Sequence, residues 1–241
     1  MNQASMRKLR VQGTNGDLQA QCRLADHYCR LETETGNREA IRWLKLAAAQ
    51  GESWAQYQLG YAFAEGSGVR RNQNEAARWY ELAAAQGYGS AQLNLGIILA
   101  NRRGVDRDLS RAVVLYRSAA RQGRRNAMYN LGLYYLHGRG VHKNLRVSFQ
   151  WYMKAALAGH TEAQFQVGYC LHEGEGVRRN PRQSVAWYRR AAHGGDAVAH
   201  FNLHLCYKMG DGIRANSARA RYHLKKAAAL GMSRARKRLA E

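Results

Sequence analysis

The chain has 241 residues, of which 46% are hydrophobic, and it contains a single proline. This hydrophobic content excludes a wholly disordered chain, and the scarcity of proline favours helix almost throughout. The charge is unusual, because 38 Lys and Arg residues against 17 Asp and Glu residues give a formal net charge of +21. A charge of this size attracts polyanions, such as nucleic acid, an anionic membrane surface or an acidic protein.

No pattern for export or membrane insertion is found. Residues 1–15 include basic residues but no apolar run after them, unlike a secretory signal. No stretch of 18 apolar residues is present to span a bilayer, and four cysteines are too few for a disulfide framework. We therefore expect a reducing, cytoplasmic location. A signal peptide removed before residue 1 stays open as the alternative.

Along the chain, a glycine recurs every 36 residues, at Gly51, Gly87, Gly123, Gly159, Gly195 and Gly231. A fixed period of this length is typical of solenoid repeat proteins. The glycines bound five repeats in register, 51–86, 87–122, 123–158, 159–194 and 195–230, and an earlier repeat at about 16–50 fits after a one-residue deletion. We expect residues 1–15 to be a flexible basic arm and residues 16–241 to be a single repeat domain.

Each repeat predicts two amphipathic helices, A and B. In helix A, Ala55, Leu59, Gly60 and Phe63 are spaced to share one face, and the glycine is expected where a second backbone comes close. A Gly-x-Gly-Val turn follows at positions 66–69, 138–141 and 174–177, and its first glycine suits a left-handed helix end. Three residues after the valine position stands a capping side chain, namely Asn72, Asp108, Asn144, Asn180 or Asn216.

Helix B repeats a Trp-Tyr-x-x-Ala pattern, and two such short helices must stack on neighbouring pairs to bury their faces. The pattern occurs at 79–83, 151–155 and 187–191. After the sixth repeat, residues 231–241 predict a lone capping helix, near 232–240, with Leu239 facing inward and the basic residues Arg234, Arg236, Lys237 and Arg238 facing outward.

These motifs resemble the Sel1-like repeat, a relative of the tetratricopeptide repeat. The shared pattern is Ala-x-x-x-Leu-Gly, then Gly-x-Gly-Val, then Ala-x-x-Trp-Tyr-x-x-Ala-Ala, and it covers about residues 16–240. The resemblance implies an all-α, right-handed superhelical scaffold that assembles or regulates protein complexes. The sequence departs from the pattern at His204, which replaces the helix A glycine and predicts looser packing in the sixth repeat.

The same resemblance implies that the helix A faces form a concave groove, and that the residue before the conserved leucine points into it. Five consecutive repeats have an amide there, namely Gln58, Asn94, Asn130, Gln166 and Asn202, whereas the first repeat has Arg23. An amide both donates and accepts, so a ladder of amides suits the backbone of an extended peptide. The alternative is that each amide bonds a neighbouring helix. Of the surrounding aromatic residues, Tyr61 and Tyr169 are those expected to be exposed and to anchor a partner.

Basic residues are distributed unevenly. Residues 16–87 hold 8 basic and 9 acidic residues, whereas residues 88–241 hold 27 and 8. The basic set falls mainly in turns and helix B, and so is expected on the convex face and one edge. Its members are Arg70, Arg71, Arg102, Arg103, Arg107, Arg111, Arg117, Arg121, Arg124, Arg125, Lys143, Arg178, Arg179, Arg189, Arg190, Arg214, Lys225 and Lys226.

No candidate for catalysis or metal binding stands out. His200 and His204 are four residues apart with Cys206 nearby, but His200 takes a position that other repeats fill with glutamine. Because some Sel1-like proteins are described as acting on β-lactams, the pair Ser5 and Lys8 is notable, but no partner motif accompanies it. We therefore predict no enzyme, no cofactor and no metal.

The sequence thus predicts a non-catalytic scaffold, adaptor, regulator or inhibitor that binds an acidic protein or an extended peptide segment. The groove amides, Tyr61 and Tyr169 would hold the partner, and the turn arginines Arg178 and Arg179 would steer it. The second hypothesis is a nucleic-acid-binding solenoid that uses the basic surface of repeats 3 to 6.

Overall fold

The computed structural model describes residues 3–101 and 108–240, and the described residues form helices and turns without a strand. The chain divides into two compact units, residues 1–122 and 123–241. None of the described helices combines the length and the apolarity that crossing a membrane requires.

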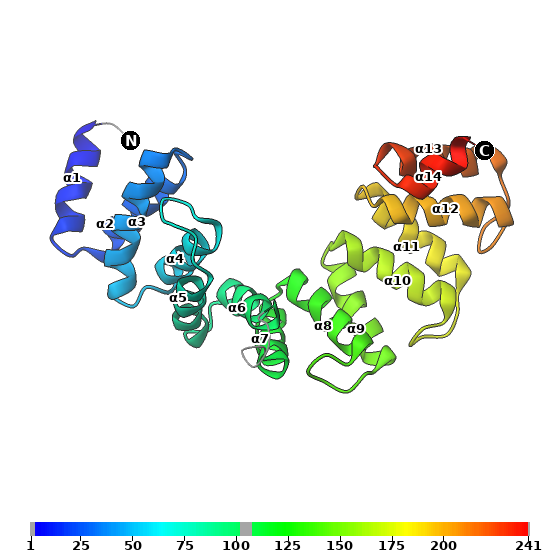
Figure 1. The fold of residues 1–241 in the computed structure, drawn as a ribbon, viewed down its shortest axis with the longest axis horizontal. Helices are drawn as coiled ribbons and strands as arrows, with labels where there is room; N and C mark the ends of the chain where they lie inside the picture. The colour runs from blue at the N-terminus through cyan, green and yellow to red at the C-terminus, as the bar shows by residue number, and fades with distance from the viewer. Residues whose placement is uncertain (1–2, 102–107, 241) are drawn as a thin grey trace. The chain divides into compact units, whose positions relative to one another are not determined.

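Within each unit, consecutive helices pack as antiparallel pairs, and each pair consists of a helix A and a helix B (Figure 1). Unit 1 holds a single helix and three pairs: α1 (Gln3–Thr14), α2 (Leu18–Cys29), α3 (Glu34–Ala49), α4 (Ser53–Glu65), α5 (Gln73–Ala85), α6 (Gly89–Asn101) and α7 (Leu109–Arg121). Unit 2 holds three pairs and a single helix: α8 (Arg125–His137), α9 (Leu145–Leu157), α10 (Thr161–Glu173), α11 (Pro181–His193), α12 (Ala197–Met209), α13 (Ser217–Ala229) and α14 (Ser233–Ala240).

The six predicted helix pairs and the C-terminal helix are confirmed. The inward residue of α14 is a correction: Ala235 is fully buried, whereas Leu239 is 38% exposed. Arg236, which was predicted to face outward, also bonds the neighbouring helix α13, because its Nε donates to the carbonyl of Ala228 at 3.1 Å. A helix of eight residues turns only one narrow face toward α13, and the small alanine fits this close approach.

Residues 3–14 are a second correction, because they form helix α1 in place of the expected flexible arm. Leu9 is buried, and the Arg10 guanidinium bonds the Tyr28 hydroxyl. Gln21 Nε2 donates to the Gly13 carbonyl at 2.9 Å, and Gln56 makes the same bond eight residues back, to Ala48. Helix α1 therefore packs on α2 as the helix B of a preceding repeat would. A half repeat carries only half of the motif, and periodicity could not reveal it.

The turns follow the sequence prediction. Gly66, Gly138, Gly174 and Gly210 end their A helices in the left-handed conformation, with φ between 68° and 83°. Each predicted capping side chain accepts a backbone N–H at the start of helix B; Asp108, for example, accepts from Arg111 at 2.7 Å. The second turn glycine is required for a further reason, because a Cβ on Gly68 would lie 2.6 Å from the Asn37 carbonyl carbon of the preceding repeat.

Inside a pair, a tyrosine of helix B lies flat over the glycine of helix A. The four tyrosines Tyr80, Tyr116, Tyr152 and Tyr188 are essentially fully buried. A Cβ on Gly60 would lie 2.5 Å from the Tyr80 ring, and one on Gly168 would lie 2.7 Å from the Tyr188 ring. The expectation of a second backbone is therefore corrected: what the glycine mainly accommodates is an aromatic ring.

The first and sixth repeats have other residues at the positions of the helix A glycine and the helix B tyrosine. The sixth has His204 with Leu224, and the first has Ala25 with Leu44. Where helix A gains a side chain, helix B carries the smaller leucine. His204 and Leu224 are both buried, and His204 Nδ1 lies 3.0 Å from the Ala220 carbonyl. The looser packing that His204 predicts in the sixth repeat is therefore not found at this position, because the two substitutions compensate each other.

The glycine–tyrosine contact can be tested in repeat 5. The substitution Gly168→Ala places a methyl group against the Tyr188 ring, and we expect a loss of about 1–3 kcal/mol in the free energy of unfolding. The double variant Gly168→Ala/Tyr188→Leu copies the first repeat, and it should lose less than the two single variants together, because the methyl group partly fills the space that the ring leaves. Urea unfolding measures both. Strict additivity would contradict the packing described.

Candidate functional site

The predicted amide ladder occupies equivalent positions on the A helices. Gln58, Asn94, Asn130, Gln166 and Asn202 are all half-buried, so each has part of its side chain at the surface. Three residues after each amide, on the same helical face, stands a large apolar residue: Tyr61, Ile97, Leu133, Tyr169 or Leu205. Tyr61 is 47% exposed and Tyr169 is 37% exposed, as predicted.

In unit 1 these residues line two adjacent pockets. One, of about 280 Å³, lies between the first and second repeats and includes Gln58. The other, of about 300 Å³, lies between the second and third repeats and includes Asn94 and Ile97. Tyr61 lines both, so its exposed ring forms the wall between them. The repeat thus places an amide and an apolar wall at each junction of this unit.

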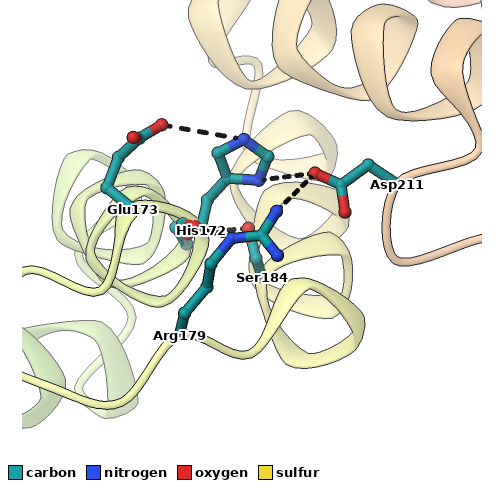
Figure 2. Close-up of polar contacts among 6 residues, drawn as sticks. His172, Glu173, Arg179, Ser184 and Asp211 are labelled. Atoms are coloured by element: carbon teal, nitrogen blue, oxygen red, sulfur yellow. Dashed lines mark hydrogen bonds and ion pairs between the residues drawn. The ribbon is translucent and has the colours of Figure 1, made fainter.

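In unit 2 a pocket of about 100 Å³ repeats this arrangement with Asn202, Leu205 and Met209. His172 and Asp211 stand at its edge. Figure 2 shows Arg179 reaching from its turn to the same carboxylate, with Arg179 Nη2 to Asp211 Oδ2 at 2.9 Å and His172 Nδ1 to Asp211 Oδ2 at 3.7 Å. Arg179 also donates to the His172 carbonyl at 2.9 Å. We call these three pockets the amide pockets.

The two predicted turn arginines therefore differ. Arg179 joins the turn of repeat 5 to that of repeat 6 through Asp211, which gives it a structural role. Arg178 is exposed beside it.

Ser184 makes a polar bond between α11 and α10, because its hydroxyl donates to the Gly168 carbonyl at 2.7 Å (Figure 2). Ser148 makes the same bond to Gly132, which accounts for serine at positions where other repeats have alanine.

One ladder amide also bonds a neighbouring repeat. Asn94 Nδ2 donates to the Tyr80 hydroxyl at 3.1 Å, which links helix A of the third repeat to helix B of the second. The pKa of Tyr80 is raised chiefly by its burial, so the hydroxyl stays neutral. Asn94 therefore has a packing role, and the role of the ladder toward a partner stays a prediction.

The charges are separated on this surface. The residues lining the amide pockets include the carboxylates of Glu32, Glu65 and Asp211, and none of them is lysine or arginine. Every described member of the basic set is exposed, and all of them lie on helix B or in the turns except Arg125, which begins α8, a helix A. Arg102, Arg103 and Arg107 lie outside the described residues. A polyanion would therefore find no lysine or arginine lining the amide pockets, although Arg179 stands beside the pocket of unit 2 through its bond to Asp211.

The positions considered for chemistry offer no activated group. Ser5 and Lys8 lie on the exposed side of α1. Burial raises the pKa of the Cys206 thiol to about 11 and that of Cys170 to about 12, and a neutral thiol is a poor nucleophile. Among the described residues, no group of three His, Cys, Asp or Glu side chains is placed to hold a metal ion.

A chain of glutamine bonds ties the repeats of unit 1, and sequence reasoning missed it. Gln86 Nε2, at the end of one helix B, donates to the Gly51 carbonyl at 2.9 Å and to Gln56 Oε1 at 2.8 Å. Gln56 in turn donates to the Ala48 carbonyl of the preceding repeat at 3.4 Å. The recurrence of Ala-Gln-Gly at 49–51, 85–87 and, with Arg in place of Ala, at 121–123 was the available signal.

Helix pairs repeated in tandem, with a surface of matched amides, define an α-solenoid repeat protein. The Sel1 repeat matches residues 18–52, 55–88, 89–123, 125–160, 161–196 and 197–232. The chain belongs to the Sel1 repeat family. Sel1 repeat proteins generally mediate protein–protein interactions, and the family is generally non-catalytic.

Three solved structures show the likeness. A protective antigen of uropathogenic Escherichia coli, c5321, is 34% identical with a TM-score of 0.91 over 97% of this chain. A Sel1 repeat protein from Oxalobacter formigenes is 33% identical with a TM-score of 0.79, over 88% of this chain and 84% of its own. The immunity protein PA5088 from Pseudomonas aeruginosa has a TM-score of 0.55, over 87% of this chain and 82% of its own, but only 16% identity, and it shares the fold alone.

The present chain spans 50% of the length of the E. coli protein. No curated protein matches this chain.

The Asn94–Tyr80 bond can be measured by a double-mutant cycle. Asn94→Ala and Tyr80→Phe should each lower the free energy of unfolding, and we expect about 0.5–1.5 kcal/mol for the shared bond. The double variant should lose less than the two single variants together, since only one bond is broken. If the losses were additive, Asn94 would have no packing role and would be available to a partner in full.

Proposed function

We propose that this protein is a non-catalytic interaction scaffold that holds an extended segment of a partner protein against the amide pockets. The observation that carries the proposal is the repeated pairing of a half-buried amide with a large apolar side chain at the mouth of each pocket. An adaptor, a regulator and an inhibitor would all use such a surface.

The chemistry of the pairing fits a peptide backbone with spaced apolar side chains. A half-buried amide presents a donor and an acceptor without regard to the peptide's side chains. The intervening apolar pockets would take the side chains and supply most of the affinity, because buried anchors dominate binding energy. In unit 1 the pockets on the two sides of Tyr61 would take two such anchors.

We further propose that the partner is acidic outside the segment that the pockets hold. The excess of exposed Lys and Arg on helix B and the turns favours approach of an anionic surface, and it exceeds what solubility needs. The pockets themselves carry carboxylates, so an acidic peptide is not expected inside them. Long-range charge would then accelerate association, while the pockets would set specificity.

Nucleic acid is the second candidate, and only the basic surface supports it. Duplex bound by scattered exposed cations would dissociate steeply with added salt and would lack sequence preference. A partner whose capture survives nuclease treatment favours the protein scaffold, and one that is lost favours nucleic acid.

The proposal is tested by placing a photoreactive benzophenone side chain at Tyr61 or Tyr169 in living cells. We expect both positions to cross-link the same protein after nuclease treatment, because both belong to the same type of repeat surface. Leu157, which is 70% exposed at the end of helix B, is the matched control and should not cross-link it. Cross-linking at Leu157 alone would place the partner on the basic face and contradict the proposal.

With that partner in hand, Asn130→Ala or Asn202→Ala should weaken binding by about 1–3 kcal/mol, because a polar group of the peptide loses its bond partner. The melting temperature should change much less.

Arg178→Ala should chiefly change the association rate and its salt dependence, since this exposed side chain would act at a distance. Calorimetry and stopped-flow mixing separate the two effects. Normal binding by the Asn variants, with binding lost on Arg178→Ala, would refute the role of the amides.

A further inference from the structure

The sixth repeat departs from the repeat pattern at two positions that meet in space. His223 stands on helix B where repeats 2, 4 and 5 have Trp79, Trp151 and Trp187. His200 stands on helix A where repeats 2, 3 and 5 have Gln56, Gln92 and Gln164. The two imidazole Nδ1 atoms lie 2.9 Å apart. Two independent substitutions thus create one imidazole pair between α12 and α13.

The imidazole pair lines a cavity of about 490 Å³ that opens between α11, α12 and α13. A histidine ring is smaller than an indole, so the missing tryptophan leaves space between the two B helices. The polar lining consists of Arg189, His193, His200, Tyr222, His223 and Lys226. We call this cavity the imidazole pocket. It lies between two B helices and one A helix, and none of its lining residues belongs to an amide pocket.

The cations of this pocket are held in place without a carboxylate. Arg189 Nη2 donates to the Tyr207 hydroxyl at 2.8 Å, and Arg219 reaches the same oxygen at 3.4 Å. Among the described residues, no carboxylate lies within ion-pair distance of Arg189, Arg219 or Lys226. Asp196, the acidic residue nearest to His200, caps the start of α12.

Lys226 differs from its equivalents in the two preceding repeats. Lys154 lies 4.3 Å from the centre of the Trp151 ring, and Arg190 lies 4.4 Å from that of Trp187. In the sixth repeat the tryptophan is absent, and Lys226 lines the pocket and lies 5.8 Å from the Tyr222 ring. The positive charge of this pocket is therefore left without a compensating anion or a covering indole.

We propose that the imidazole pocket binds a phosphate-like oxyanion, either free or carried on a phosphorylated side chain of a partner. Arg189 and Lys226 supply the opposite charge, and the imidazoles supply further N–H donors in a partly desolvated site. The same cations disfavour a metal ion, which would otherwise suit a histidine pair. The inference is independent of the proposed function, because none of these residues lines an amide pocket.

Binding is expected to take up protons. Burial, then the charges of His200, Arg189, Arg219 and His204, lower the pKa of His223 to about 4 from its ordinary 6.5, and burial and Lys226 lower that of His200. Without an anion, the folded state therefore loses stability as the pH falls from about 6.5 toward 4. An oxyanion in the pocket raises both pKa values, because an opposite charge favours the imidazolium. Affinity should therefore increase as the pH falls.

The test uses the full chain and sulfate, which stays a dianion over the pH range studied, so that any pH dependence belongs to the protein. We expect saturable binding by calorimetry and a matching shift of the His200 and His223 imidazole signals in NMR spectra. The affinity should rise severalfold between about pH 7.5 and about pH 6. Inorganic phosphate and a phosphoserine peptide are then compared, and tighter binding of the peptide identifies a partner as the source.

Matched variants distinguish binding in the imidazole pocket from non-specific attraction to the basic surface. Arg189→Gln should weaken sulfate binding about tenfold or more, because it removes a charged donor of the pocket. Arg190→Gln removes the neighbouring charge outside the pocket and should change binding less than about twofold. His223→Trp restores the residue of repeats 2, 4 and 5 and should abolish binding by filling the cavity. Equal losses from Arg189→Gln and Arg190→Gln, or a titration that leaves the imidazole signals unmoved, would overturn the proposal even if His223→Trp failed to fold.

Discussion

The close contact between a helix A glycine and a helix B tyrosine is the constraint on which the structure depends. A flat ring that takes the place of a Cβ lets the two helices approach closely, and it buries a large apolar surface in a repeat of only two short helices. In the second repeat the hydroxyl of Tyr80 also reaches the adjacent repeat, where it accepts from Asn94. There, one side chain sets both the spacing inside a pair and a bond between pairs.

The same contact determines where the binding surface lies. Because Gly60 follows Leu59 and faces Tyr80, the residues on the other side of that turn, Gln58 and Tyr61, are directed toward the surface. The amides and apolar residues therefore recur with the period of the core. Their regular spacing is a consequence of packing, and an extended polymer with regular backbone groups is the natural ligand for it.

The residues that depart from the repeat pattern have two different structural effects. His204 and Leu224 exchange volume between two helices, and Ser148 and Ser184 each satisfy a carbonyl inside a pair, so all four are explained by packing. His200 and His223 are not explained in this way, because they open a cavity and leave cations beside it. In a repeat protein, each residue can be compared with its equivalents in the other repeats, so a substitution that worsens local packing can be recognised.

The sequence by itself determined the helix pairs, their caps, the left-handed turn glycines and the exposure of Tyr61 and Tyr169, because these follow from local spacing that recurs from repeat to repeat. Only the tertiary structure decided what each periodic residue touches. In the structure, an aromatic ring lies over Gly60, where a backbone was expected. Arg179 forms an ion pair with Asp211. Helix α1 is part of the fold through Leu9 and Gly13. The physical reason is that periodicity specifies which residues share a helical face, whereas contacts between helices depend on side-chain volumes that meet across tens of residues of chain.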